Sequence, residues 1–268
     1  MSMVSINDQE FAQFQRFIFE AAGITLSTSK KALVSGRLAK RLTHCRLDSY
    51  SAYFAFLKSA QAGEEVQTAV DLLTTNETYF FRESKHFDFL RTQALAAAQR
   101  AQPFRVWSAA SSTGEEAYSI AMVLADCMGS TPWEILGSDI SSRVLQDAAT
   151  GHYSMQRTRN IPASYLRRFC LRGNGPHEGT LLIERSLRSK VRFVQVNLNT
   201  PLPEVGKFDL IFLRNVMIYF NDDTKRQVVG RVLSALKSGG HFFVGHSESL
   251  NGISQAVRPL APSIYQKP

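Results

Sequence analysis

The sequence lacks the features of secreted and membrane-spanning proteins. Its three cysteines, Cys45, Cys127 and Cys170, are far apart and form no C-x-x-C pair, so we expect reduced thiols in a bacterial cytoplasm. No apolar run approaches the roughly 18 residues that a membrane span needs, and the first residues show no signal-peptide pattern. No cluster of histidine and cysteine has metal-ligand spacing, so the sequence predicts no metal site.

The dinucleotide fingerprint G-x-G-x-x-G is also missing, although residues 104–116 have the matching order of elements. A predicted strand, residues 104–108, breaks into small residues up to Gly114, and a helix opens with Glu115 and Glu116. Strand, tight loop and helix in this order hold nucleotide-type ligands at the carboxyl end of a parallel sheet. Two glutamates suit a pyrophosphate poorly, which disfavours a NAD-dependent dehydrogenase. They favour a ligand with positive charge and hydroxyls, such as S-adenosylmethionine.

An alternation of predicted strands and helices follows and indicates an α/β fold. We expect further strands at residues 134–139, 191–198, 208–213 and 241–245, a helix at 223–236, and an antiparallel edge near 263–266. Asp139 ends the second strand, where an acid accepts hydrogen bonds from ribose hydroxyls. An aspartate after a strand is a helix N-cap at least as often, and both interpretations remain open.

An insert of about 161–190 separates the second and third of these strands. Its glycine-rich run, residues 172–179, lies between two segments of strand length, 166–170 and 180–183. This pattern predicts a small antiparallel excursion from the main sheet.

The first 75 residues predict a small all-helical domain, with helices near 7–22, 29–46, 49–60 and 64–73. Asn7 and Glu10 have the spacing of a capping box. The second helix carries a one-sign basic stripe, and no acid occurs between Ser27 and Leu47. Such a stripe favours an acidic partner surface, although a solvated face is about equally consistent with charge alone. The stripe consists of Lys30, Arg37, Arg41 and His44, and Lys40 adds charge beside it and is included with them among the predicted partner-contacting residues.

Four motifs together resemble one family, the CheR-type glutamate O-methyltransferases of bacterial chemoreceptors. They are residues 74–83 (TTNETYFFRE), 107–116 (WSAASSTGEE), 214–220 (RNVMIYF) and 245–249 (GHSES), and the resemblance spans nearly the whole chain. Ser111 and Ala117 depart from the family pattern, which often has Cys and Pro there, but neither change removes a polar group that binds the ligand.

The resemblance implies a Rossmann-like S-adenosylmethionine-dependent methyltransferase domain with a small antiparallel β-subdomain, preceded by the helical domain. It places the receptor-contacting domain at 1–75, a linker and motif helix at 76–95, and the catalytic domain at 96–268. The cofactor residues that it implies are Asn76, Thr78, Arg82, Glu116, Asp139, Asn197, Leu198, Arg214 and Asn215. For Leu198, a plain core role is equally compatible with the sequence.

The implied partner is the cytoplasmic signalling domain of a methyl-accepting chemotaxis receptor, without membrane insertion and without nucleic acid. In some family members the β-subdomain docks a short peptide at the receptor's C-terminus. The docking loop here resembles that of such members, through Arg172, Gly173, Gly175 and Gly179.

The implied reaction is consistent with the residue types in the motifs. A glutamate carboxylate is already ionised at neutral pH, so it needs no general base to attack a methyl group. The site must align it, and Arg82 and the phenol of Tyr219 are the predicted catalytic residues. Two rival interpretations remain: a methyltransferase for nucleic acid or a small molecule, and a module that binds cofactor or receptor tail without turnover. No N/D-P-P-Y/F run, which would favour a base methyltransferase, follows the fourth strand.

Overall fold

The computed structural model describes residues 5–268 and divides into two compact units. The helical unit comprises the chain up to Thr75 together with Tyr219–Lys225, and the sheet unit comprises Asn76–Ile218 and Arg226–Pro268. Within the described residues, no helix is both long and apolar enough to span a membrane.

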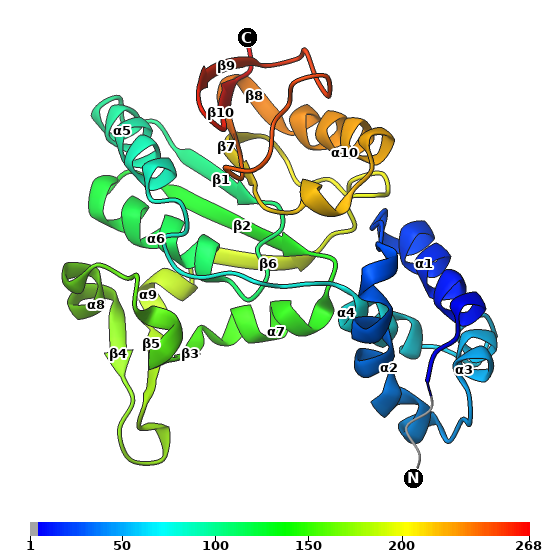
Figure 1. The fold of residues 1–268 in the computed structure, drawn as a ribbon. Helices are drawn as coiled ribbons and strands as arrows, with labels where there is room; N and C mark the ends of the chain where they lie inside the picture. Colours follow the sequence, from blue (N-terminus) through cyan, green and yellow to red (C-terminus); the bar gives the residue numbers. More distant parts are fainter. Residues whose placement is uncertain (1–4) are drawn as a thin grey trace. The chain divides into compact units, whose positions relative to one another are not determined.

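The helical unit packs four helices around an aromatic core (Figure 1). Phe14 stacks on Tyr53 with ring centroids 6.1 Å apart and meets Tyr50 edge-on. The predicted capping box is present, because the side chains of Asn7 and Glu10 each accept the other's backbone N–H. A later segment joins the unit through a bridge between Ile24 and Phe220, which the sequence did not predict. The helices are α1 Asp8–Ala22, α2 Lys31–Cys45, α3 Tyr50–Leu57 and α4 Glu65–Leu73.

The sheet unit contains a seven-stranded sheet of order β6-β2-β1-β7-β8-β10-β9. The first five of these strands are parallel, and β10 and β9 add an antiparallel edge. The strands are β1 Phe104–Ser108, β2 Trp133–Asp139, β6 Val191–Gln195, β7 Phe208–Leu213, β8 Leu236–Val244, β9 Arg258–Ala261 and β10 Ile264–Gln266. The strand order reverses at β1, so the carboxyl ends of β1, β2 and β7 form a crevice position of the kind that binds nucleotides.

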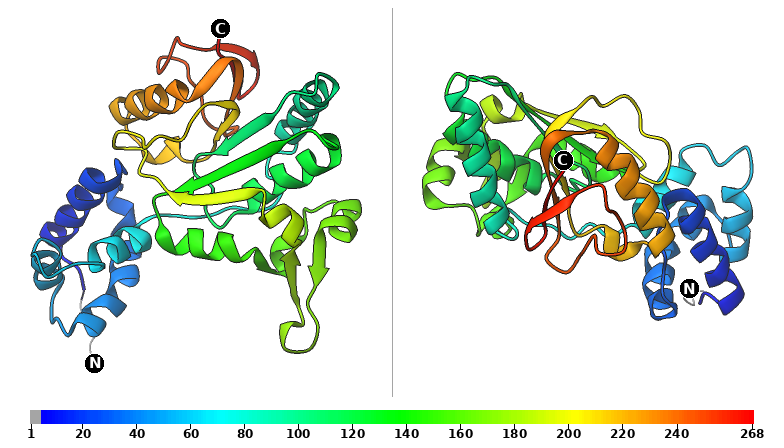
Figure 2. Two further views of the ribbon diagram at one scale, coloured as in Figure 1. Left: turned by 180° about the vertical axis from the view of Figure 1, so that it is seen from behind. Right: turned by 90° about the horizontal axis from the view of Figure 1, so that it is seen from above.

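Helices cover the sheet, and buried side chains fix the strands' register. The helices are α5 Lys85–Gln99, α6 Glu115–Cys127, α7 Ser142–Thr150 and α10 Asp222–Ser234. Helix α5 packs on α6, and α7 runs alongside β2 and β6 (Figure 2). The Trp107 indole is fully buried and donates to the Ser138 hydroxyl at 2.9 Å, which fixes β1 to β2. On the other side of β1, Phe212 stacks on Phe243 at 4.4 Å.

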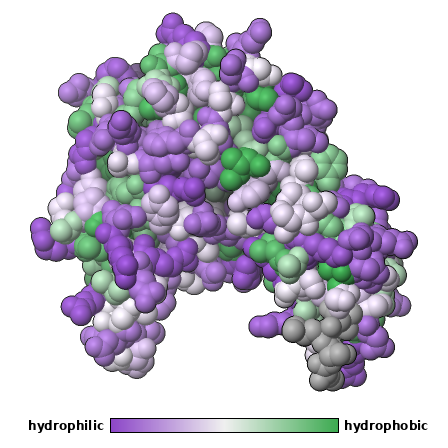
Figure 3. Space-filling view, viewed as in Figure 1, coloured by the Kyte–Doolittle hydropathy of each residue, from purple (hydrophilic) through white to green (hydrophobic). Residues whose placement is uncertain are grey.

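Together with β3, which lies before the expected start of the insert, the insert forms a separate three-stranded antiparallel sheet of order β3-β5-β4. Its strands are β3 His152–Ser154, β4 Cys170–Arg172 and β5 Thr180–Ile183, with α8 Ala163–Phe169 and α9 Arg185–Arg188 beside them. The prediction of a strand at 166–170 was wrong, because Tyr165 and Phe169 share the buried face of α8 at helical spacing. The loop between β4 and β5 extends away from the main sheet, and its tip is polar (Figures 1 and 3).

Other boundaries also differ from the predictions. The strand expected at 191–198 ends at Gln195, so Asn197 and Leu198 lie in the loop beyond it. Strand β8 begins at Leu236 and runs through Gly239 and Gly240, which the sequence placed before the strand. Strands β3 and β9 were not predicted, because both are short and mostly exposed.

Candidate active site

The predicted cofactor residues of the α/β alternation gather at the carboxyl edge of four neighbouring parallel strands. Asp139 ends β2, Arg214 follows β7, and Asn197 follows β6, while the loop to α6 leaves β1 at Ser108. Because these strands are adjacent in the order β6-β2-β1-β7, the polar residues at their ends lie along one continuous edge of the sheet.

Asp139 fastens the loop after β1 to the end of β2. One of its carboxylate oxygens accepts the Ser112 backbone N–H at 2.9 Å, and the other accepts that of Ser141 at 3.0 Å. The N-cap of α7 is Ser141, whose side chain accepts from Val144, so the N-cap interpretation of Asp139 was wrong. Ser112 has a φ of 48°, a left-handed conformation that is uncommon outside glycine.

The two glutamates at the start of α6 have different surroundings. Glu115 is fully buried, accepts the Thr113 hydroxyl at 2.7 Å and is ion-paired with Arg157 from the segment after β3. Burial raises the pKa of Glu115 despite these partners. Glu116 instead accepts from the Ser108 hydroxyl at 2.7 Å and faces the sheet edge. Of the two glutamates, only Glu116 was a predicted cofactor residue, and it is the one at this edge.

Arg214 lies between two carboxylates. Its side chain is 1% exposed, and its two terminal nitrogens reach Glu116 Oε2 at 2.8 Å and Glu83 Oε2 at 2.9 Å. Its Nε is buried with no hydrogen-bond partner. Two carboxylates around one guanidinium leave a surplus negative charge at this edge, which suits a cationic ligand.

Glu83 is a central residue of this edge. It belongs to the motif at 74–83, but no role was predicted for it. It accepts the His246 backbone N–H at 3.1 Å and the Asn215 side-chain amide at 3.4 Å, in addition to Arg214. Burial opposes its ionisation, but the charge and hydrogen bonds of Arg214 outweigh burial and hold the pKa of Glu83 below its usual value. The only sequence signal for it was its place at the end of residues 74–83.

The backbone at this junction is strained. Phe81, Glu83 and Asn215 have φ values of 54°, 60° and 57°. Non-glycine residues adopt this conformation at a free-energy cost and keep it only where surrounding contacts impose it. Here the bonds of Arg214, together with the 2.8 Å bond from the Asn215 N–H to Glu248, impose it.

Residues 76–83 form an irregular segment before α5. The backbone carbonyl of Asn76 accepts the Ser112 hydroxyl at 3.2 Å, so this segment lies against the loop after β1. The N-cap position of α5 is Ser84, so Asn76 and Thr78 lie before the helix and do not cap it. The Arg82 guanidinium donates to the Glu77 carbonyl at 3.1 Å and lies over the Tyr79 ring.

Three further predicted site residues, Asn197, Leu198 and Tyr219, have contacts within the protein. Asn197 Oδ1 accepts the Asn199 N–H at 2.9 Å, and Leu198 is buried at 7% exposure. Tyr219 belongs to the helical unit, where its carbonyl accepts the Thr25 N–H at 2.8 Å.

The basic stripe of α2 divides into an inner and an outer part. Arg37 donates to the Thr74 carbonyl at 2.8 Å beyond the end of α4, and Arg41 pairs with Glu65, whose other partner is the Tyr53 hydroxyl. Burial favours the neutral form of Glu65, but Arg41 and Tyr53 outweigh it and lower its pKa. The exposed basic residues are Lys30 and His44 of the stripe and Lys40 beside it.

The predicted docking loop lies in the β-subdomain. Arg172 ends β4 and is exposed, and Gly175 and Gly179 have positive φ values of 54° and 77°. A Cβ on Gly173 would lie 2.0 Å from the His177 carbonyl oxygen, so this turn requires glycine.

Comparison with known proteins identifies the family. Two family profiles match: "CheR methyltransferase, all-alpha domain" over residues 9–74, and "CheR methyltransferase, SAM binding domain" over residues 76–265. The chain belongs to the CheR methyltransferase family. This CheR chain is 42% identical over 260 residues to "Chemotaxis protein methyltransferase 2" of Pseudomonas aeruginosa, covering 96% of the chain and 92% of that protein.

Two enterobacterial relatives agree with this assignment. The chemotaxis protein methyltransferase of Escherichia coli is 39% identical over 265 residues, covering 98% of this chain and 92% of that protein. That of Salmonella typhimurium is 39% identical over 269 residues, covering 98% and 91%. The CheR chain is therefore a methyltransferase whose cofactor is S-adenosylmethionine. The surplus negative charge around Arg214 fits the sulfonium and amino groups of that cofactor.

Proposed function

We propose that this CheR protein transfers a methyl group from S-adenosylmethionine to glutamate side chains of chemoreceptors, giving glutamyl methyl esters and S-adenosylhomocysteine. Methylation of chemoreceptors in chemotaxis is the activity of its family. The observation that carries the choice of glutamate is the acid-free segment 27–47, which exposes Lys30 just before α2 and Lys40 and His44 on α2. A surface of one sign attracts a glutamate-rich helix before methylation.

Each cofactor residue is proposed to bind the part of S-adenosylmethionine that suits its side chain. Glu116 faces the cofactor's amino group, Asp139 its ribose hydroxyls, and Asn197 and Leu198 its adenine. Asn76, Thr78, Arg214 and Asn215 complete the site. In support, both carboxylates are held at the strand edge: Arg214 fixes the orientation of Glu116, and Asp139 accepts the Ser112 backbone N–H.

The chemical step needs alignment rather than a base. A carboxylate oxygen of the receptor glutamate forms a bond to the methyl carbon while the carbon–sulfur bond breaks, and its electron pair goes to sulfur. The ionised carboxylate attacks without losing a proton, so the step requires no general base. Alignment at near-attack distance is therefore the contribution that we propose for the site.

Arg82 is the proposed residue that orients the acceptor or the cofactor carboxylate. Among residues 5–268 its guanidinium forms no ion pair, being held by a carbonyl and an aromatic ring, and so retains capacity to bind an anion. We expect Arg82→Ala to raise KM for the receptor or the cofactor severalfold. If both cofactor affinity and turnover stay within about a factor of two, this role is wrong. Tyr219→Phe tests the proposed role of its phenol in the same assay.

The receptor is proposed to contact the exposed basic residues Lys30, Lys40 and His44. Arg37 and Arg41 then act indirectly, by holding α2 against α4. Each ester formed removes one negative charge from the receptor, so this attraction weakens as the reaction proceeds.

A second receptor contact is proposed at the β-subdomain, where a C-terminal receptor peptide with aromatic and acidic residues docks. Leu171 is 51% exposed beside Arg172 on the outer strand β4, which offers an apolar and a cationic group to such a peptide. Through these contacts the protein works in the bacterial cytoplasm at receptor arrays.

The decisive experiment uses methyl-labelled S-adenosylmethionine and a receptor cytoplasmic fragment. We expect base-labile label on the fragment, and its loss when the acceptor glutamates are changed to glutamine. Tight cofactor binding without transfer would favour a non-catalytic module, and label that survives base would indicate a different acceptor group.

A further inference from the structure

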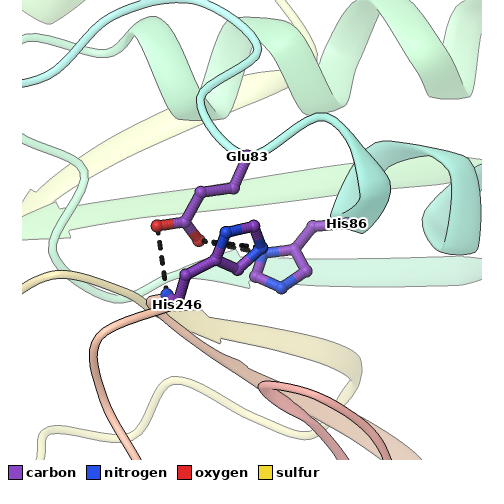
Figure 4. Close-up of side chains that lie close together, drawn as sticks. All are labelled: Glu83, His86 and His246. Carbon is purple, nitrogen blue, oxygen red and sulfur yellow. Dashed lines mark hydrogen bonds and ion pairs between the residues drawn. The ribbon is translucent and has the colours of Figure 1, made fainter.

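Three side chains from distant parts of the sequence lie close together beside Arg214. Glu83 precedes α5, His86 lies in the first turn of that helix, and His246 follows β8 (Figure 4). One ligand atom from each lies within 4.8 Å of the others. Glu83 Oε2 is 3.5 Å from His86 Nδ1 and 3.8 Å from His246 Nε2. In a tetrahedral zinc site with bonds of about 2.0–2.1 Å, neighbouring ligand atoms lie about 3.4 Å apart.

The His86 ring presents an unshared nitrogen to this space. Its Nε2 lies 2.8 Å from the Ser263 hydroxyl, and that hydroxyl donates its one hydrogen to the Pro262 carbonyl at 2.6 Å. Nε2 therefore carries the ring hydrogen, and Nδ1 carries a lone pair. Nδ1 is buried without a hydrogen-bond partner in a side chain that is 1% exposed.

This arrangement has the features of a metal-binding histidine. Histidines that bind metals donate their second ring N–H to an oxygen, which fixes the tautomer and the ring orientation. Ser263 provides that oxygen for His86. A lone pair on Nδ1 and a carboxylate oxygen face each other at 3.5 Å, and a cation between them removes their repulsion.

The third proposed ligand, His246, lies on the side from which an ion can enter from solvent. The His246 side chain is 51% exposed, and its ring lies beside that of His86 with centroids 5.1 Å apart. Figure 4 shows both rings gathered beside the Glu83 carboxylate. Two histidines and one glutamate leave a fourth position for water.

We propose that Glu83, His86 and His246 bind a borderline transition-metal cation such as Zn²⁺, and that the bound ion lowers methyl transfer. The local charge permits this despite Arg214, because Glu83, Glu116 and Glu248 together exceed its single positive charge. Imidazole nitrogens select such ions over Mg²⁺ or Ca²⁺.

The inhibitory part rests on the proposed function. Glu83 Oε2 is the same atom that accepts from Arg214 Nη2. A cation on this oxygen repels the guanidinium and weakens the contact that holds Arg214 and, through it, Glu116. The ion therefore acts on the cofactor residues without touching the receptor.

Metal binding is tested without any activity assay. The metal-free full-length protein is titrated with Co²⁺, and visible d–d absorption, followed by its loss on addition of Zn²⁺, reports the site. We expect saturation at one equivalent in the parent and at least tenfold weaker binding in His246→Gln. His177→Gln, an exposed histidine in the β-subdomain, is the matched control and keeps full affinity. Absence of a saturable signal up to millimolar Co²⁺, or equal binding by His246→Gln, overturns the site.

The second arm measures methyl transfer with and without Zn²⁺. We expect inhibition of the parent that a chelator reverses, and a severalfold weaker response in His246→Gln. A parent that binds Co²⁺ but transfers methyl groups at the same rate with Zn²⁺ present overturns the inhibitory role. A parent that transfers no label even without metal contradicts the proposed function instead, and the Co²⁺ result stands apart from it.

Discussion

Each unit of the molecule contains an arginine that is paired with glutamate, and the two arrangements differ in what surrounds them. In the helical unit, Arg41 reaches Glu65 from one regular helix to another, and Tyr53 completes the hydrogen bonds of that carboxylate. In the sheet unit, Arg214 lies between Glu83 and Glu116, its Nε has no partner, and residues around it have left-handed backbone conformations.

We infer that the Arg41 pair holds the helical unit together, whereas the Arg214 arrangement positions the proposed cofactor site. The Arg41 pair is satisfied and joins elements that each form from local sequence patterns. The Arg214 arrangement leaves surplus negative charge and stores strain, and such costs are typical of functional sites. The following predictions test this contrast.

The largest effect is expected from Arg214→Met. Without the guanidinium, the carboxylates of Glu83 and Glu116, which are 11% and 12% exposed, lose their shared counter-charge, and losing one partner of a buried pair costs about 3–5 kcal/mol in stability. We expect cofactor affinity to fall by about 100-fold or more, measured by calorimetric titration of S-adenosylhomocysteine. Circular dichroism at the same temperature checks that the variant is folded. Affinity within a few-fold of the parent would remove Arg214 from the cofactor site.

Arg41→Met is expected to change stability and leave the cofactor site intact. The pair is partly buried, so we expect a loss of about 2 kcal/mol in the free energy of unfolding, between the values for exposed and buried pairs. Urea unfolding measures this loss, with the affinity for S-adenosylhomocysteine as the second readout. A large fall in that affinity would show that the contrast between the two arginines is wrong.

Lys40→Glu tests the exposed basic residues of α2. A reversed charge on an exposed position that faces an acidic partner is expected to raise KM for the receptor fragment by about fivefold to tenfold, and less at high salt. Lys85→Glu makes the same charge change on an exposed residue of α5 and is the control. Equal effects of the two variants would make α2 an ordinary solvated face.

The smallest effect is expected in the pH dependence of stability. The pKa of Glu65 is lowered below its usual value of about 4.5 in the folded protein. The stability that ionised Glu65 contributes is therefore complete above that usual value. It is lost as pH falls through the pKa of Glu65 in the folded protein, because the unfolded chain binds the proton first. We expect Glu65→Gln to flatten the fall in stability below pH 5, whereas Glu64→Gln, an exposed neighbour, leaves it unchanged. Parallel curves for parent and Glu65→Gln would contradict this.

Local patterns predicted many of the elements in both units. Periodicity placed α1 to α4, the start of α6 and the strands β1, β2 and β7 within a few residues, because each has one apolar face or a continuous apolar run. The prediction of a strand at 166–170 was wrong. The buried residues Tyr165 and Phe169 have helical spacing, but Tyr165 lies just outside those five residues, so they alone do not distinguish a strand from a helix.

The sequence by itself determined the helical first unit, the α/β alternation that follows it, the one-sign charge of α2 and the ligand class at the loop after β1, since these depend on residues that are near one another in the chain. Only the tertiary structure decided which charges remain outside: it directs Arg37 and Arg41 inward and leaves Lys40 exposed. It also brought Glu83 to Arg214 and His246, residues separated by more than a hundred positions. Such pairings follow from strand order and packing, and no spacing along the chain encodes them.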